Sequence, residues 1–154
     1  MKRFRPIHGM LLVPVFVVGV FLLAGGLGMG KHQRVSPNEE GVVRLGVDDI
    51  ERGQVRYYRF LNRGNQEVLF FVGRDRHGEL QVAFDASESH SVVGRGFRHE
   101  GDWMVDAKCD TAMRLEEVND GGGGCRPVPL EHRESGGEVI IAEAEILKGW
   151  RLFN

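Results

Sequence analysis

The sequence lacks an excess of positive charge. Its 154 residues contain 20 Lys and Arg against 22 Asp and Glu, which gives a formal net charge of -2 and a pI near 6.3. A protein that binds a nucleic-acid backbone needs clustered cationic side chains to neutralise the phosphates. The charge balance therefore argues against nucleic acid as a partner, and the length indicates one domain with an ordinary core.

Signatures of common enzyme classes are also absent. No G-x-S-x-G nucleophile elbow surrounds Ser87 or Ser89, although His90 lies next to them in sequence. The glycine run at 121–124 is not followed by the Gly-Lys-Ser/Thr of a phosphate-binding loop. With 22 acidic residues in the chain, neighbouring carboxylates are expected by chance. We therefore expect a protein that is not an enzyme.

Charged side chains are missing from one long segment near the N-terminus. None lies between Met10 and Met29, and a helix of that length spans roughly 30 Å, the thickness of the hydrocarbon core of a bilayer. Three basic residues, Lys2, Arg3 and Arg5, precede this segment. The positive-inside rule keeps such a cluster in the cytoplasm, so the remainder of the chain is predicted to lie on the other side.

These features predict a single-pass protein of the cytoplasmic (inner) membrane with a periplasmic or extracellular C-terminal domain. The expected parts are a basic cytoplasmic N-terminus at 1–9, a transmembrane anchor at 10–29, a linker at 30–40 and an extracytoplasmic domain at 41–154. A cleaved signal peptide is the alternative for the apolar segment, because a charged start followed by an apolar stretch is common to both.

Beyond residue 40, short segments rich in Val, Phe, Tyr and Leu alternate with turn sequences. Short helical turns are predicted at 48–53 and 111–118. The fold class indicated is mainly β, a small α+β domain of antiparallel strands with a glycine-rich region that carries the site. The predicted strands are GVVRLGV from Gly41, QVRYYRFL from Gln54, EVLFFVG from Glu67, ELQVAFD from Glu79 and EVIIAEAEI from Glu138.

The segment from Gly94 to Pro129 is poor in apolar residues and rich in glycine, so we expect it to supply little hydrophobic core. Ordering the backbone costs about 1–2 kcal/mol per residue, and a disulfide or a metal is the usual compensation where little surface is buried. The only two cysteines of the chain, Cys109 and Cys125, both fall in this segment.

The middle of the chain reads FFVGRDRHGELQVAFDASESH, followed by GRGF, MVDAKC and GGCRPVPL. This order and spacing resembles the FtrD-like family of membrane iron–sulfur proteins, whose exported domain carries two Cys-x-x-Cys motifs and a lone cysteine. The resemblance extends over roughly residues 42–153. It implies an accessory protein of bacterial iron uptake that handles iron or electrons beside a membrane permease or redox protein.

The family's cysteine positions are only partly kept in this chain. By the resemblance, the first Cys-x-x-Cys falls on Ser87 and His90, the second on Asp106 and Cys109, and the lone cysteine on Cys125. Three of the five expected cysteines are therefore replaced. Histidine and aspartate are themselves metal ligands, whereas serine is a poor one. The candidate metal ligands are His90, Asp106, Cys109 and Cys125, with Ser87 and His99 as neighbours that could hydrogen-bond to a ligand.

Three interpretations of this set remain open. The four side chains could bind one zinc, iron or copper ion, or they could hold an iron–sulfur cluster with mixed ligands. Alternatively, Cys109 and Cys125 form a disulfide and no cofactor is bound, as is usual for a cysteine pair in an oxidising compartment. Closing a loop of this length stabilises by roughly 3 kcal/mol in the chain-entropy model.

Two functions follow from these interpretations. The first is a membrane-anchored metal-binding or electron-transfer accessory protein. The alternative is a non-catalytic structural or interaction module that keeps the fold, contains the disulfide and binds another membrane protein.

Overall fold

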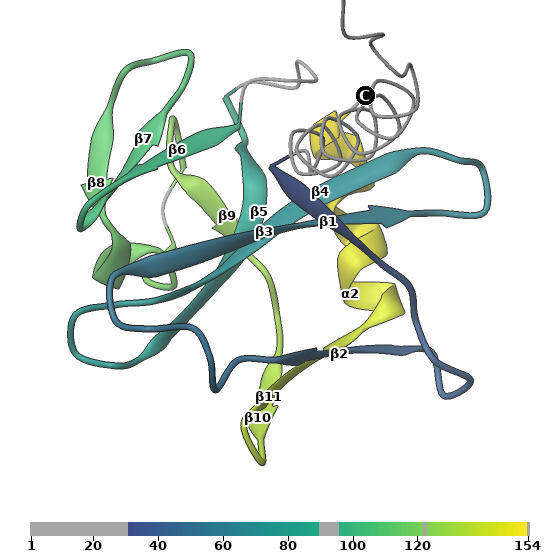
Figure 1. Cartoon of the computed structure of the whole chain (residues 1–154). Coiled ribbons are helices and arrows are strands. Elements are labelled where there is room, and N and C mark those ends of the chain that lie inside the picture. Colours follow the sequence, from purple (N-terminus) through teal and green to yellow (C-terminus); the bar gives the residue numbers. More distant parts are fainter. Residues whose placement is uncertain (1–30, 90–95, 122, 154) are drawn as a thin grey trace, which may run out of the picture. The chain divides into compact units, whose positions relative to one another are not determined.

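The computed structural model describes residues 31–89, 96–121 and 123–153 (Figure 1). The predicted anchor at 10–29 and the candidate ligand His90 lie outside these residues. Among the described residues, we find no helix with the length and apolar character needed to span a bilayer.

The described part of the chain is mainly β, as predicted, with a short helical segment at its C-terminal end. The strands are β1 (His32–Val35), β2 (Val42–Gly46), β3 (Gln54–Leu61), β4 (Glu67–Arg74), β5 (Leu80–Ser87), β6 (Phe97–Glu100), β7 (Trp103–Asp106), β8 (Ala112–Arg114), β9 (Pro127–Pro129), β10 (Arg133–Ser135) and β11 (Glu138–Ala142). The helical elements are η1 (Leu115–Glu117), α2 (Glu143–Lys148) and η2 (Gly149–Phe153).

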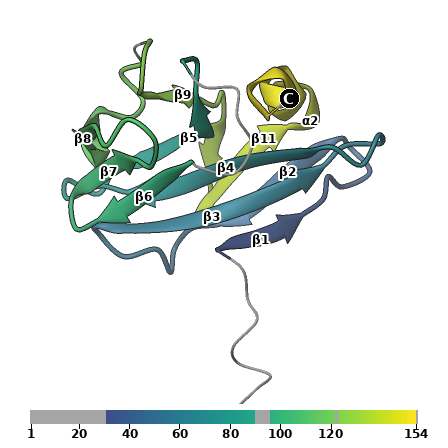
Figure 2. The same ribbon diagram turned by 90° about the horizontal axis from the view of Figure 1, so that it is seen from above.

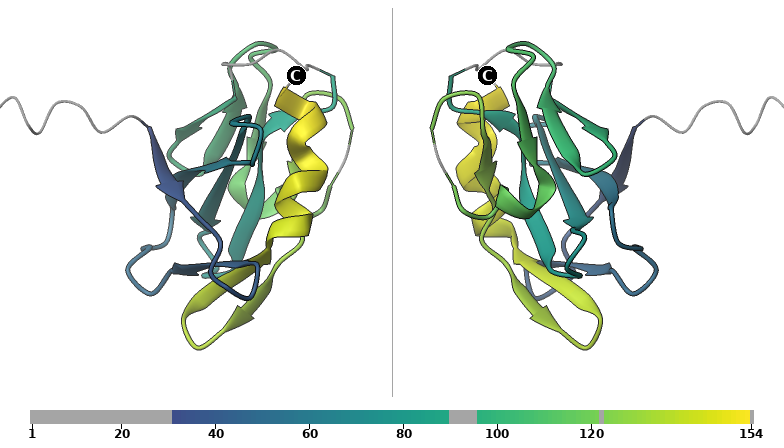
Figure 3. Two further views of the ribbon diagram at one scale, coloured as in Figure 1. Left: turned by 90° about the vertical axis from the view of Figure 1, so that its right-hand side faces the viewer. Right: turned by 90° about the vertical axis from the view of Figure 1, so that its left-hand side faces the viewer.

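The strands form three sheets. The largest has the order β1-β3-β4-β5-β9, and the two smaller ones have the orders β10-β11-β2 and β6-β7-β8. Neighbouring strands pair antiparallel, except that β1 runs parallel to β3. The sheet β6-β7-β8 and the helix α2 lie on opposite sides of β5 and β9 (Figures 1 and 2). Figure 3 shows α2 continuing directly from β11, whose hairpin with β10 projects from the body.

Two apolar clusters lie on the two faces of the largest sheet, because successive side chains of a strand point to opposite faces. On β4, Phe70 belongs to one cluster and its neighbour Phe71 to the other, and both are fully buried. The main core lies between this sheet, β2, β11 and α2, and includes Phe60, Phe70, Val139, Ile141 and Ile146. The second core lies under β6-β7-β8 and consists of Phe71, Ala83, Phe97, Met104, Met113, Leu115 and Val118.

Most predicted strands are confirmed, with small differences at their ends, but several other expectations need correction. Residues 30–40 were predicted to be a linker, yet His32–Val35 form β1, since pairing with β3 satisfies their backbone groups. Residues 48–53 form turns without a helix. The last predicted strand ends at Ala142, and Glu143–Lys148 form α2, since Ala, Glu, Leu and Lys favour helix and Ile146 reaches the main core.

The prediction that the segment from Gly94 to Pro129 supplies little core is also wrong. Phe97, Met104 and Met113 are buried in the second core, together with Leu115 and Val118. These side chains are far apart in sequence, but the hairpins between β6, β7 and β8 place them on one face. The helical turn predicted at 111–118 is confirmed only in its second half, where the 3-10 helix η1 lies, because Ala112–Arg114 form β8.

Candidate functional site

The candidate site begins with a tight turn at the end of β7. The Asp106 carboxylate Oδ1 accepts hydrogen bonds from the backbone N–H groups of Lys108 and Cys109, each at 2.8 Å. The Asp106 N–H donates to the carbonyl of Thr111 at 2.9 Å, which closes the turn. Asp110 adopts a left-handed φ of 56°, a conformation that Asp tolerates better than most residues. A short acidic side chain that bonds to the next N–H groups thus positions Cys109.

The second part of the site is the glycine-rich segment that leads to Cys125. Gly121 and Gly124 have φ values of 72° and 77°, which L-residues with side chains rarely adopt. The N–H of Ser89 donates to the Gly124 carbonyl at 3.3 Å, which places this segment beside the end of β5. Cys125 is thereby brought to Cys109, and the two form a disulfide with a Cα–Cα distance of 6.4 Å.

Ser87, the last residue of β5, joins the two parts. Its side chain is buried, and its Oγ lies 3.4 Å from Asp106 Oδ2, to which it donates a hydrogen bond. The ligand atoms of Asp106, Cys109 and Cys125 lie within 4.8 Å of one another. The structure therefore brings together Ser87, Asp106, Cys109 and Cys125, the four described positions at which the resemblance placed family cysteines.

His99, the other histidine considered for the site, is not part of this group. It lies on β6 opposite Met104, and its ring Nε2 is buried without a hydrogen-bond partner among the described residues. Met104 and Met113, which flank Cys109 in sequence, are buried in the second core. Trp103 is 41 % exposed, and the Arg114 guanidinium lies over its ring.

The chemistry open to the site depends on the oxidation state of its sulfurs. The thiolate is the form of cysteine that binds metals, and in the disulfide neither sulfur is a thiolate. The Asp106 carboxylate is held by a hydroxyl and two backbone N–H groups in this state. After reduction, two sulfurs and a carboxylate would remain close together, a donor set that suits zinc, iron or copper.

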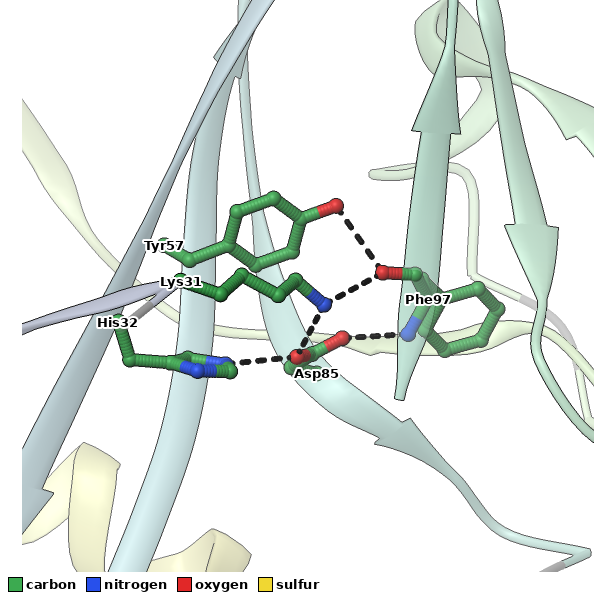
Figure 4. A network of polar contacts seen from close by, with 5 residues as sticks. All are labelled: Lys31, His32, Tyr57, Asp85 and Phe97. Atoms are coloured by element: carbon green, nitrogen blue, oxygen red, sulfur yellow. Dashed lines mark hydrogen bonds and ion pairs between the residues drawn. The ribbon is translucent and has the colours of Figure 1, made fainter. Parts of the chain in front are cut away.

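Sequence reasoning missed a polar network around Asp85 (Figure 4), which precedes Ser87 by two residues on β5. The Asp85 side chain, which is 1 % exposed, accepts a hydrogen bond from Lys31 Nζ at 3.0 Å and lies 2.8 Å from His32 Nε2. Its other oxygen accepts the N–H of Phe97 at 2.6 Å. Burial works to raise the pKa of Asp85, but the contacts with His32, Lys31 and Phe97 outweigh it and hold that pKa below its usual 3.8.

Tyr57 completes this network from β3. Its hydroxyl donates to the Phe97 carbonyl at 3.0 Å, and Lys31 Nζ donates to the same oxygen at 2.6 Å while lying 3.7 Å from the centre of the Tyr57 ring. Burial, with the nearby charge of Asp85, raises the pKa of Tyr57 well above its usual 10.0. Lys31 and His32 stood in the predicted linker, and no spacing rule links them to Asp85.

Comparisons with known proteins add one finding. A family model described as "Membrane iron-sulfur containing protein FtrD-like" matches residues 50–153. No curated protein and no solved structure matches the chain. The matched range includes Ser87, Asp106, Cys109 and Cys125, but not Lys31 and His32.

Proposed function

Because the chain belongs to the family of FtrD-like membrane iron-sulfur containing proteins, we propose that it is a non-catalytic accessory module of a membrane-associated iron-handling system. In this chain the Cys109–Cys125 disulfide stands where the relatives are expected to bind a cluster. The domain then acts by binding another membrane protein, a permease or a redox protein, on the periplasmic or extracellular side.

The observation that supports this proposal is the disulfide itself. It joins the turn after β7 to the segment before β9 across 16 positions of sequence. Hydrogen bonds also hold both ends: Asp106 accepts from the N–H groups of Lys108 and Cys109, and the Ser89 N–H donates to the Gly124 carbonyl. Closing a loop of this length stabilises by roughly 3 kcal/mol. The bridge therefore supplies the order that a cluster gives to a cysteine-rich relative.

The second candidate function is metal binding or electron transfer by the reduced protein. It is favoured by the close approach of the donor atoms of Asp106, Cys109 and Cys125. His90 would be the fourth ligand of this site. Zinc, iron and copper all accept two thiolates with an imidazole and a carboxylate, whereas a mixed-ligand iron–sulfur cluster is the rarer arrangement.

Thiol counting and metal analysis separate the two candidates. The full chain would be extracted in detergent without reductant, denatured and treated with a thiol reagent, while a second portion is analysed for metals and visible absorption. The disulfide module predicts no free thiol and no stoichiometric metal. Two free thiols with bound iron, zinc or copper, lost in Cys109→Ser, would contradict it and establish the second function. Lys108→Ala, which changes a neighbour of Cys109 without removing a sulfur, is the matched control.

A further inference from the structure

We propose that the segment from Lys31 to Val35 is a strap that holds the disulfide-bearing turn in place through Asp85. The inference goes beyond the proposed function, because it assigns a role to residues outside the range that the family model matches. It rests on a chain of direct contacts from Lys31 and His32 to Cys109.

The strap is attached at two levels. Its backbone pairs in parallel with β3, where His32 lies opposite Tyr57 and Val35 opposite Phe60. Its first two side chains meet the buried Asp85 carboxylate, and Lys31 also donates to the Phe97 carbonyl (Figure 4). The His32 and Tyr57 rings meet edge to face, with centroids 5.5 Å apart. The strap is thus fixed to β3, β5 and β6 at once.

From Asp85 the contacts continue to the disulfide. The carboxylate accepts the N–H of Phe97, and Phe97 pairs with Asp106 across β6 and β7. The Ala107 N–H donates to the Gly96 carbonyl at 3.0 Å, and Asp106 in turn holds the N–H of Cys109. Residues 96–97 and 106–107 therefore form a relay between Asp85 and the turn that carries Cys109.

Gly96 shows how closely Asp85 fits this relay. A Cβ atom at Gly96 would collide with the Asp85 carboxylate, and the Gly96 φ of 25° is itself unusual for a residue with a side chain. The carboxylate therefore touches the backbone of the relay directly. Any displacement of Asp85 changes the position of residues 96 and 97.

Electrostatics explain why the strap is needed. A buried carboxylate is costly unless it is paired, and removing one partner of a buried pair leaves a charge that the protein interior does not solvate. Among the described residues, Lys31 is the cation that contacts Asp85, and His32 is its other side-chain partner. Without them the carboxylate either moves toward water or takes up a proton, and both changes weaken its hydrogen bond with the Phe97 N–H.

The test measures how fast the Cys109–Cys125 disulfide is reduced under native conditions. Full-length protein and the Lys31→Ala/His32→Ala variant would be exposed to dithiothreitol, quenched with a maleimide and analysed by mass. Hydrogen bonds to charged groups contribute enough to stability that their loss should accelerate reduction by about tenfold. Ile141→Val, in the main core on β11, is the matched control because it lowers overall stability without touching the relay.

Two results would overturn the proposal. One is that the disulfide of the Lys31→Ala/His32→Ala variant is reduced at the wild-type rate. The other is that the Ile141→Val control, with the same melting temperature as that variant, shows an equal acceleration of disulfide reduction. Asp85→Ala, which removes the acceptor of the Phe97 N–H, should reproduce the acceleration, and adding Lys31→Ala to it should give little more. Hydrogen exchange of the amides at 106–109 provides the same comparison whatever the state of the sulfurs. If the wild-type protein carries free thiols, the proposed function is refuted. The role of the strap is then tested by hydrogen exchange of the amides at 106–109, which should be faster in the Lys31→Ala/His32→Ala variant.

Discussion

The main core and the site region, residues 85–89, 96–111 and 121–126, are stabilised in different ways. The main core buries large apolar side chains from β2, β3, β4, β5, β11 and α2 against one another. The site region contributes Phe97 and Met104 to the second core, but its turns are joined by a disulfide, two buried carboxylates and their hydrogen bonds. Burial of apolar surface is cooperative and spreads over many contacts, whereas each polar contact acts locally. Mutations in the two regions should therefore differ in how much stability they remove and in how far through the fold that loss spreads.

The largest effect is expected in the main core. Phe70 is fully buried on β4 and stacks on Tyr58 with ring centroids 5.4 Å apart. Phe70→Ala should lower the free energy of unfolding by about 3–5 kcal/mol, because it removes a large apolar side chain and leaves a cavity. Urea unfolding would measure the loss, and hydrogen exchange should show it in every sheet. A loss confined to β4 would contradict a cooperative main core.

Loss of the disulfide should lower the free energy of unfolding nearly as much, but its effect on hydrogen exchange should be confined to the site region. Replacing both Cys109 and Cys125 by Ser should cost roughly 3 kcal/mol, since the unfolded chain regains the entropy of an open loop. Hydrogen exchange should accelerate in 96–126 while the amides of β4 keep their protection. The single Ser replacements are the controls, because each removes the bridge and should match the double variant. Equal loss of protection in β4 would show that the two regions form one unit.

The same difference explains how much could be predicted from the sequence. Strands such as β3 and β4 carry alternating or continuous apolar residues, a local signal that survives without any tertiary information. The convergence of His90, Asp106, Cys109 and Cys125 was predicted through the resemblance; the structure brings the last three together, and His90 lies outside the described residues. Whether the sulfurs form a bridge or bind a metal was left open, because both uses need the same short distance.

The missed features all depend on long-range partners. Lys31 and Asp85 are 54 positions apart, and β1 contains HQRV, a polar segment without strand-like periodicity. It becomes a strand because β3 offers it a free edge. The second core was missed for a related reason, since Phe97, Met104 and Met113 are isolated apolar residues until the hairpins bring them together. Local propensity carries no information on such pairings.

A smaller, pH-dependent effect is expected at Asp85. Asp85→Asn keeps an acceptor for the Phe97 N–H but loses the charge that pairs with Lys31, which should cost about 1–3 kcal/mol at neutral pH. Since the pKa of Asp85 is lowered below its usual 3.8 in the folded protein, the wild-type advantage is present above that pH and is lost as the pH falls further. Thermal melts of both proteins between pH 2 and 7 would measure this difference.

The melting temperatures of the wild type and of Asp85→Asn should therefore become more similar as the pH falls. A constant gap down to pH 2 would mean that the carboxylate charge contributes nothing and that the variant acts through packing alone. When Lys31→Ala is added to both proteins, the difference in melting temperature between them should become smaller over the same pH range. The reason is that Lys31→Ala removes the cation that pairs with the Asp85 carboxylate.

The smallest effect tests whether charge alone, without burial, stabilises the fold. Arg44 Nη1 on β2 lies 3.2 Å from Glu138 Oε2 on β11, and both side chains are exposed, at 44 % and 40 %. Water screens such a pair and holding two long side chains costs entropy, so Arg44→Ala should change the free energy of unfolding by no more than about 0.2–1 kcal/mol. Urea unfolding at low and high salt would measure it. If this exposed pair contributed as much to the free energy of unfolding as the Lys31–Asp85 pair, burial would not be what makes the Lys31–Asp85 pair stabilising. The strap would then have no special role compared with any other ion pair.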